Sequence, residues 1–361
     1  QIGNEEVENG DFSEVGAELV TQGDFPIGTT AWGLGSNWSI ANGKASSDGS
    51  AANSMSQAST VGIANTTFLV TYTVLEITQG SYRITLGSTS GLERSTAGTY
   101  SEYLKAADTD RLRVFATNSA IGSIDNVSVK EVGQDWSFGA GWSMGDNKAV
   151  RVASSSTDLV QAGAFPSGFA TKQFKISFDV VRSAGSVRLR AGTLSLPYVS
   201  ATDTYTYYVT PVSNDQLKFQ ADSSFVGSID NISVKEVGQR WTVSNSDADN
   251  YVVFNGSTAR LKFLNTSPIT QLIAQGFSFI SGKTYKLIVD VASVTSGSIK
   301  LNAANINESF NTAGINTRII TPNSNIAFSL YRDSANVDIT LNSVVVQELK
   351  HDATNLMLNA G

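Results

Sequence analysis

The residue types on which most enzymes rely are almost missing from this sequence of 361 residues. It contains no cysteine, and its single histidine, His351, lies close to the C-terminus. The usual nucleophile–base pairs and histidine metal sites cannot be assembled from such a set within one chain. The sequence also lacks a glycine-rich phosphate-binding loop. We therefore predict that the protein is not an enzyme and that it requires no cofactor.

Aromatic side chains are the best candidates for ligand contacts, because sugar rings stack on flat apolar faces. Tryptophans six residues apart occur twice, and two tyrosines alternate along a predicted strand so that they share one face. The candidate glycan-binding residues are Trp32, Trp38, Trp136, Trp142, Tyr205 and Tyr207. The tryptophans suit the core of a β-sandwich equally well, since such cores commonly bury a tryptophan. Both interpretations stay open.

An internal repeat shows how these residues are positioned. The dodecapeptide Ser-Ile-Asp-Asn-Val-Ser-Val-Lys-Glu-Val-Gly-Gln occupies residues 123–134 and returns at 228–239, where Val127 becomes Ile232. A diverged third copy occupies residues 341–349. Repetition at a fixed spacing is the sequence signature of tandem structural units.

Two independent landmarks give the same repeat lengths of 105 and 112 residues. They are Glu131, Glu236 and Glu348, and Gly80, Gly185 and Gly297. We therefore predict three units at 17–133, 134–238 and 239–350. The units follow one another almost without linkers, which favours a stiff arrangement.

Both ends of the chain resemble parts of a unit. Residues 1–16 are interpreted as the end of a preceding unit or as an N-terminal arm, because Val7–Phe12 resembles Val20–Phe25. Residues 351–361 form a C-terminal tail. Within it, Asn355–Gly361 is interpreted as another partial start of a unit or as a segment that docks on a neighbour.

Alternating apolar and polar residues predict strands at equivalent places in all three units. In the second unit the apolar positions are Phe174, Ile176, Phe178 and Val180. Glycine and serine clusters separate such runs about every ten residues, and no amphipathic helix is evident. The predicted fold class is all-β, with three tandem antiparallel β-sandwich (jelly-roll) domains. Tyr103 and Tyr208, which are 105 residues apart, are expected in the cores.

Charge and hydropathy exclude two classes of partner. The formal net charge is −7, whereas nucleic acids and anionic membranes are bound by basic surfaces. No apolar run approaches the ~20 residues that a membrane-spanning helix needs. We expect neither nucleic acid nor membrane as a partner.

Three motifs carry a resemblance to a known family. They are Gly23-Asp-Phe25, the stretch from Trp38 to Ala45, and the closing Ile-Asp-Asn-Val-Ser-Val at 124–129. The sequence resembles galactose-binding-like jelly rolls, which include carbohydrate-binding modules. The tandem form with Lys-Glu-Val-Gly junctions is most similar to repeats in tail-fibre and virion structural proteins of tailed bacteriophages. The resemblance covers most of residues 17–238 and supports a fold more strongly than a function.

The resemblance implies a structural calcium ion in some units. In that family the opening segment and an acidic residue of the last strand often hold calcium. The matching residues here are Asp24 with Asp125 in the first unit and Asp230 in the second. The third unit has Asn342 at this position. Family members that bind sugar use the concave face of one sheet or the loop tips.

Two functional hypotheses follow. The first is a virion structural protein of a tailed bacteriophage, a fibre, spike or capsid decoration, located at the virion surface. Its partners would be other virion proteins, further copies of itself in a homo-oligomer, and host-surface glycans. The alternative is a carbohydrate-binding or adhesive segment of a secreted bacterial protein.

Overall fold

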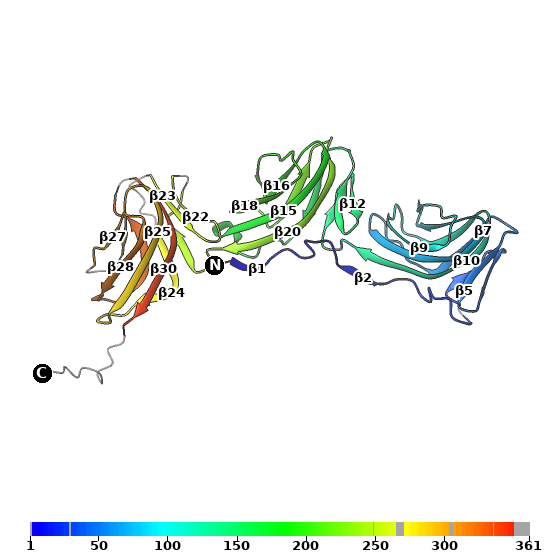
Figure 1. The fold of residues 1–361 in the computed structure, drawn as a ribbon, viewed down its shortest axis with the longest axis horizontal. Coiled ribbons are helices and arrows are strands. Elements are labelled where there is room, and N and C mark those ends of the chain that lie inside the picture. The colour runs from blue at the N-terminus through cyan, green and yellow to red at the C-terminus, as the bar shows by residue number, and fades with distance from the viewer. Residues whose placement is uncertain are drawn as a thin grey trace, which may run out of the picture.

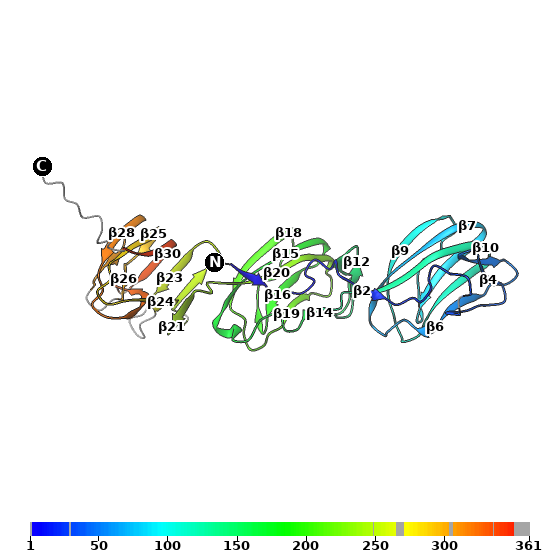
Figure 2. The ribbon, with the colours of Figure 1, turned by 90° about the horizontal axis from the view of Figure 1, so that it is seen from below.

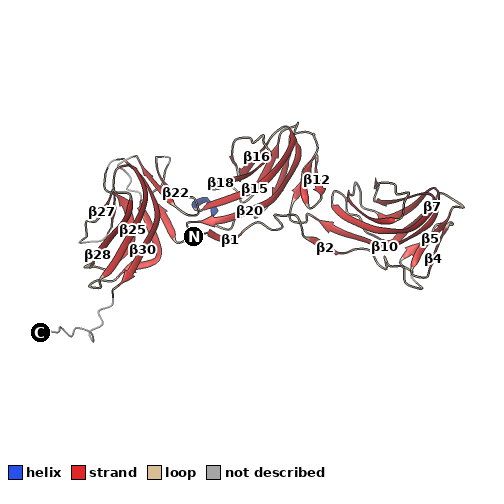
Figure 3. Ribbon diagram, viewed as in Figure 1, coloured by secondary structure: helices blue, strands red, loops and turns tan. Residues whose placement is uncertain are grey.

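The computed structural model describes residues 2–28, 30–247, 249–264, 271–302, 306–334 and 336–349. Apart from one short 3-10 turn at Phe169–Thr171, the regular elements are strands, and the main pairings are antiparallel (Figure 3). The predicted all-β sandwich fold is therefore confirmed. No helix in these ranges is long and apolar enough to cross a bilayer.

The described residues form three sandwiches, each with its own hydrophobic core. They follow one another end to end along the long axis of the molecule (Figure 1), and the view from below shows the same order (Figure 2). We call them the first, second and third sandwich, in chain order of their main strands.

In the first sandwich, two long strands join both halves into one nine-stranded sheet. These strands, β7 (Thr67–Leu86) and β10 (Arg111–Val132), pair along most of their length. The others are β2 (Val15–Glu18), β3 (Trp32–Gly33), β4 (Trp38–Ala41), β5 (Lys44–Asp48), β6 (Ser54–Thr60), β8 (Thr89–Ser90) and β9 (Gly98–Lys105).

The second sandwich consists of two separate sheets, with strand orders β12-β13-β20-β15-β18 and β11-β14-β19-β16-β17. A further strand, β1 (Ile2–Glu5), pairs with β20. The others are β11 (Ser137–Phe138), β12 (Trp142–Gly145), β13 (Lys148–Arg151), β14 (Asp158–Gln161), β15 (Gln173–Ala184), β16 (Val187–Ala191), β17 (Leu194–Ser195), β18 (Asp203–Val209), β19 (Leu217–Ala221) and β20 (Val226–Val237).

The third sandwich has the same plan, with strand orders β22-β23-β30-β25-β28 and β21-β24-β29-β26-β27. Its strands are β21 (Trp241–Ser244), β22 (Asn250–Phe254), β23 (Ala259–Phe263), β24 (Gln271–Phe279), β25 (Tyr285–Ser296), β26 (Ile299–Leu301), β27 (Ser309–Phe310), β28 (Gly314–Ile320), β29 (Ile326–Arg332) and β30 (Val337–Glu348).

One of the repeated landmarks marks the turn from one sheet to the other. Gly185 lies between β15 and β16, Gly297 lies between β25 and β26, and Gly80 lies within β7. Their φ angles are 66°, 74° and 71°. Side-chain-bearing residues rarely adopt this left-handed conformation, which explains why glycine recurs at this position.

Residues 2–25 form two arms that enter two different sandwiches. Arm 2–12 begins with β1, which pairs with β20 of the second sandwich, and its Phe12 lies in that core. Arm 15–25 begins with β2, which pairs with β10 of the first sandwich, and its Phe25 lies in that core. Residues 2–12 thus form an arm that is part of the second sandwich. In Figure 1 the dark-blue β1 runs beside β20 of the second sandwich, whereas β2 runs beside β10 of the first.

We predict that Phe12→Ala destabilises the second sandwich although the residue precedes the first one. Phe12 is buried against Trp136, with ring centroids 5.3 Å apart, and deleting a buried phenylalanine side chain costs about 3–5 kcal/mol. Amide hydrogen exchange, followed by mass spectrometry, should accelerate in residues 136–237 and stay unchanged in residues 30–132.

The matched control is Phe25→Ala, which should accelerate exchange in the first sandwich instead. Phe25 packs on Trp32 at 5.2 Å in the same arrangement. If Phe12→Ala left the second sandwich unchanged, the assignment of arm 2–12 to that core would be wrong.

Candidate functional site

The most elaborate polar site in each of the first two sandwiches is the groove that holds an arm along the last strand. Glu18 accepts hydrogen bonds from the Ser128 hydroxyl and from the Val129 N–H, at 2.9 Å for the latter. Glu5 accepts the equivalent bonds from Ser233 and Val234, each at 2.6 Å. Because the carboxylate pairs with edge-strand donors, each arm is fixed in register by charge-assisted hydrogen bonds.

A glycine lets each arm approach the last strand closely. The Val127 N–H donates to the Gly23 carbonyl and the Ile232 N–H donates to the Gly10 carbonyl, at 2.9 and 2.8 Å. A Cβ on Gly23 would lie 1.9 Å from the Val127 carbonyl oxygen. Any larger residue would force the arm away from the strand, so glycine is required by proximity.

The four candidate tryptophans belong to these cores and do not form a glycan-binding face. Trp32 and Trp136 each donate an Nε1 hydrogen bond to an arm carbonyl, Gln22 O at 3.0 Å and Asn9 O at 3.2 Å. Trp38 and Trp142 donate to backbone carbonyls of their own sandwich. All four side chains are at least 94% buried, so their faces are not available for sugar stacking. Of the two interpretations that the sequence allowed, burial in the core describes them.

Tyr205 and Tyr207 are half-buried at the rim of the second sandwich. They share one face as predicted, and both rings stack on Phe178, with centroids 5.6 and 6.2 Å apart. The Tyr205 hydroxyl donates to the Ala201 carbonyl. Tyr100 occupies the equivalent position in the first sandwich, and Arg94 lies 4.6 Å from its ring centroid. Sequence reasoning overlooked Tyr100, although it lies 105 residues before Tyr205.

Tyr103 and Tyr208 were expected in the cores, but both are half-exposed residues at junctions between sandwiches. The Tyr103 hydroxyl donates to Asn147 Oδ1 at 2.8 Å and accepts from the Asn147 N–H at 3.1 Å. Tyr208 lies at the next junction, where a Cβ on Gly256 would be 3.6 Å from its hydroxyl. The expectation failed because a strand position that faces away from its own core can still be covered by the next sandwich.

A cleft lies beside each junction. The cleft between the first two sandwiches has a volume of about 350 Å³ and is lined by residues that include Thr67, Glu131 and Phe138. The cleft between the second and third has a volume of about 700 Å³ and is lined by residues that include Lys172 and Glu236. Lys172 and Glu236 form an ion pair at 3.0 Å. Glu131 and Glu236 occupy equivalent positions, so the two clefts are versions of one site.

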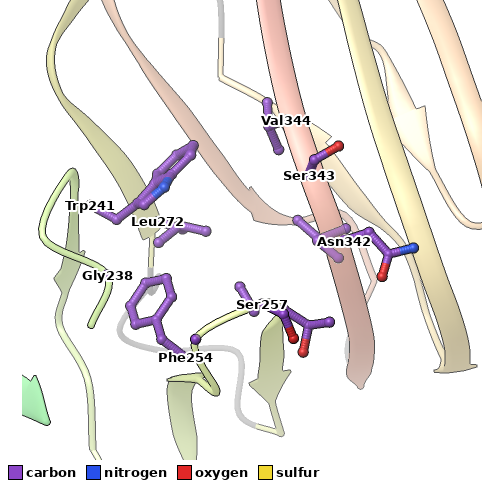
Figure 4. Close-up of a pocket in the computed structure, with 12 residues that line it drawn as sticks. Gly238, Trp241, Phe254, Ser257, Leu272, Asn342, Ser343 and Val344 are labelled. Atoms are coloured by element: carbon purple, nitrogen blue, oxygen red, sulfur yellow. The ribbon is translucent and has the colours of Figure 1, made fainter. Parts of the chain in front are cut away.

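A smaller cavity of about 100 Å³ lies in the third sandwich, beside its last strand. Trp241, Phe254 and Leu272 line one side, and Ser343 and Val344 of β30 line the other (Figure 4). Trp241 and Val344 occupy the positions of Trp136 and Ile232, which hold the arm in the second sandwich. The cavity is therefore the counterpart of the arm groove.

The residues to which the resemblance assigns calcium lie close to the arms. Asp24 is exposed, and Asp125 and Asp230 accept hydrogen bonds from the N–H groups of Asn126 and Asn231. Within the described ranges, no three side chains of His, Asp or Glu gather as a metal site would require. Calcium takes six to eight oxygen ligands, so the calcium site remains a prediction from the resemblance.

The carboxyl group of Asp230 lies in an unfavourable setting for a charge. Burial raises its pKa above the ordinary value, and the nearby carboxylates of Asp179 and Asp11 raise it further. The Asn231 N–H and Lys148 act in the opposite direction. Asp11 belongs to arm 2–12, so the arm contributes negative charge to this position.

The residues of the arms are the functional residues whose placement the sequence alone could not give. The signal for them was the similarity of residues 2–12 to residues 15–25, which places Glu5 with Glu18, Val7 with Val20 and Phe12 with Phe25. That similarity identifies two copies of one element. It does not say which sandwich each copy enters.

Comparisons with known proteins give little further information. No family model and no curated protein sequence matches this chain. Among solved structures, one described as "The Triple Jelly Roll Fold and Turret Assembly in an Archaeal Virus" is similar over 88% of this chain and 89% of that chain, at 13% identity and a TM-score of 0.18. Similarity at this TM-score supports no conclusion about fold or function.

We predict that Asp230→Asn stabilises the protein at neutral pH. A carboxyl whose pKa is raised on folding stabilises the folded state only while it is protonated, so that contribution is lost as pH rises through the raised pKa. An asparagine side chain at this position keeps a carbonyl oxygen that accepts the hydrogen bond from the Asn231 N–H, but it carries no negative charge. The melting temperature at pH 7 should rise by roughly 1–4 °C, and the difference from wild type should vanish below about pH 3.8.

Asp125→Asn is the matched control, because Asp125 faces Thr73 across the strand pair whereas Asp230 faces Asp179. Its effect should be smaller. If Asp230→Asn lowered the melting temperature, and did so only in the presence of calcium, the charge would be serving a metal ion and our prediction would be refuted.

Proposed function

We propose that this chain is a non-enzymatic structural component of the virion of a tailed bacteriophage. It would act as a stiff rod of sandwiches in a fibre, spike or capsid decoration at the virion surface. The observation that carries this proposal is the pair of arms, because the continuous segment 2–25 is built into two consecutive sandwiches. Displacement of one sandwich against the other would pull an arm from a core.

The junctions give a second line of support for a rod. At the first junction, Leu69 and Tyr103 of the first sandwich pack against the core of the second. At the second junction, the Phe254 N–H donates to Gln173 Oε1 at 2.5 Å, and Gly238 lies directly beneath the Phe254 ring. Gly133 lies in the same way beneath the Phe138 ring. Contacts at both junctions limit the movement of successive units and favour a stiff array.

A stiff rod suits display at a particle surface. It projects its far end away from the particle, and many copies on one particle convert weak contacts into high avidity. The net charge of −7 is consistent with a surface that avoids nucleic acid. Further copies of the chain and other virion proteins would be its partners, since particles impose symmetry on their components.

The first test concerns the stiffness of the rod. Combining Tyr103→Ala with Asn147→Ala removes the reciprocal hydrogen bonds at the first junction. Small-angle scattering should then show a shorter and more flexible particle with unchanged folded content, while Tyr103→Phe, which keeps the ring, should be less affected. Mass spectrometry of purified virions tests the location. Secretion of the protein by a cell that carries no prophage would contradict the virion assignment.

A glycan-binding function is the second candidate, and the stacked tyrosines at the rim favour it. Tyr205 and Tyr207 expose part of their rings beside polar groups, which is the environment that sugar rings require. The third sandwich has Asn316 at the position of Tyr205, so binding would be confined to the first two sandwiches.

We expect a glycan array to give signals that Tyr205→Ala and Tyr207→Ala reduce by about tenfold, since losing one stacked aromatic ring costs on the order of 1 kcal/mol or more. Trp38→Phe is the control for a buried aromatic and should leave binding unchanged. If the array gave no signal even with multivalent protein, the adhesive function would be refuted. The chain would then act as a spacer or decoration.

A further inference from the structure

The last strand of the third sandwich has an uncovered edge where the other two sandwiches hold an arm. On one side, β30 pairs with β25 along its whole length, and on the other side β23 covers only residues 337–341. Among the described residues, no strand pairs with the second edge at residues 342–349. Exposed edges of this kind carry unpaired N–H and C=O groups and accept an added strand.

The apolar side chains around this edge are more exposed than their counterparts in the other sandwiches. Val344 and Val346 are half-buried, whereas their counterparts in the first sandwich, Val127 and Val129, are 3% and 0% exposed. Trp241 is half-buried as well, while Trp136 is 5% exposed. Within the described part of the chain, Trp241 Nε1 has no acceptor such as the arm carbonyl that Trp136 uses. The groove is formed but lacks its strand.

The groove of the third sandwich differs in shape from the other two. Phe254 stands where the second sandwich has Met144, so a larger side chain fills part of the space. The remaining cavity of about 100 Å³ is smaller than the ~150 Å³ cavity that accepts benzene. A cavity of this size suits one aliphatic side chain.

We propose that the C-terminal segment 353–361 of the same chain is the third arm and fills this groove. These residues lie outside the described part of the chain, and their sequence follows the arm pattern. When Gly361 is placed at the position of Gly23, Leu358 falls at the position of the buried Val20. The segment supplies the aliphatic residue and the glycine.

A paired change supports this register. In the first two sandwiches a glutamate of the arm bonds a serine of the last strand, as Glu18 bonds Ser128. In the third sandwich the serine position is Val345, which is 40% exposed, and the glutamate position falls on Leu356. A polar pair is thus replaced by an apolar pair, and docking would cover an exposed valine with a leucine.

The connection has a suitable length and direction. Arm 15–25 runs antiparallel to β10, and Val15 pairs with Val132, the counterpart of Leu349. In the proposed register residue 353 takes the place of Val15, so residues 350–352 form a three-residue hairpin loop. Loops of this length commonly join antiparallel strands.

A second copy of the chain is a poorer source for the arm. Each copy has two full arms, and both are bound in its own sandwiches. Donation of one arm to a neighbour would fill one groove and open another. The tail has no such cost, and it is tethered next to the groove.

Disulfide trapping in the full chain tests the proposal, because the protein has no cysteine of its own. The test pair is Leu356→Cys with Gln347→Cys, at positions equivalent to Glu18 and Lys130, which face each other across the strand pair. We expect an intramolecular disulfide in high yield, read by mass spectrometry and by gel mobility without reductant. The positive control is Glu18→Cys with Lys130→Cys.

The matched negative control is Leu356→Cys with Lys286→Cys. Lys286 pairs with Gln347 on the side of β30 opposite the proposed arm. A docked tail would therefore lie two strands away from Lys286, beyond the ~7 Å limit between the Cα atoms of a disulfide. A yield about tenfold below that of the test pair is expected, since bridging requires close Cα atoms. Equal yields would show an undocked tail, and disulfides between chains would show exchange with a second copy. Either result overturns the proposal.

Amide hydrogen exchange gives a readout that needs no cysteine. Deletion of residues 351–361 should accelerate exchange at the amides of Val344 and Val346 by about tenfold or more, because exposed edge amides lose protection. The amides of Val127 and Val129 should not change. Unaltered exchange at Val344 and Val346 would also refute the docked tail.

Discussion

The open edge of the last strand is the constraint on which this architecture depends. Each sandwich ends on a long strand whose outer edge is half covered by a strand of its own sheet, β5 for the first sandwich and β13 for the second. The other half of the edge presents unpaired backbone groups beside apolar side chains. Leaving these backbone groups unpaired, or the apolar side chains exposed to water, costs free energy. An arm that brings a hydrogen-bonded glutamate, a glycine and a phenylalanine resolves both problems at once.

This solution couples neighbouring sandwiches. The arm of the second sandwich precedes the first sandwich in the chain, so more than a hundred residues separate Phe12 from its partner Trp136. The entropic cost of such a long connection is modest, because each doubling of loop length costs only about 0.6 kcal/mol. Folding of the first sandwich also shortens the distance that the arm must span. The result is a long-range contact that makes the stability of one sandwich depend on a segment attached to the other.

The fold class could be predicted from the sequence because short-range patterns determine the strands and turns. Alternation in strands such as Phe174–Val180 and glycines at the left-handed corners each report a backbone state that neighbouring residues impose. The sequence does not show which sandwich a segment packs against, because that choice depends on surfaces that exist only after folding. The similarity of Val7–Phe12 to Val20–Phe25 revealed a repeated element. It did not show which sandwich each copy enters. For the same reason Tyr103 could be aligned with Tyr208 but not assigned to a junction, and Trp38 could be either core or ligand face until its burial was known.

Some of the changes that distinguish the third sandwich lie where an arm would bind. Val345 replaces a serine and Asn342 replaces an aspartate of both other sandwiches, and Phe254 replaces Met144 of the second. A groove that receives a different strand is expected to change where its side chains contact that strand. The changes at Val345 and Asn342 replace polar side chains by less polar ones, as a more apolar strand than the arms at residues 2–12 and 15–25 would require.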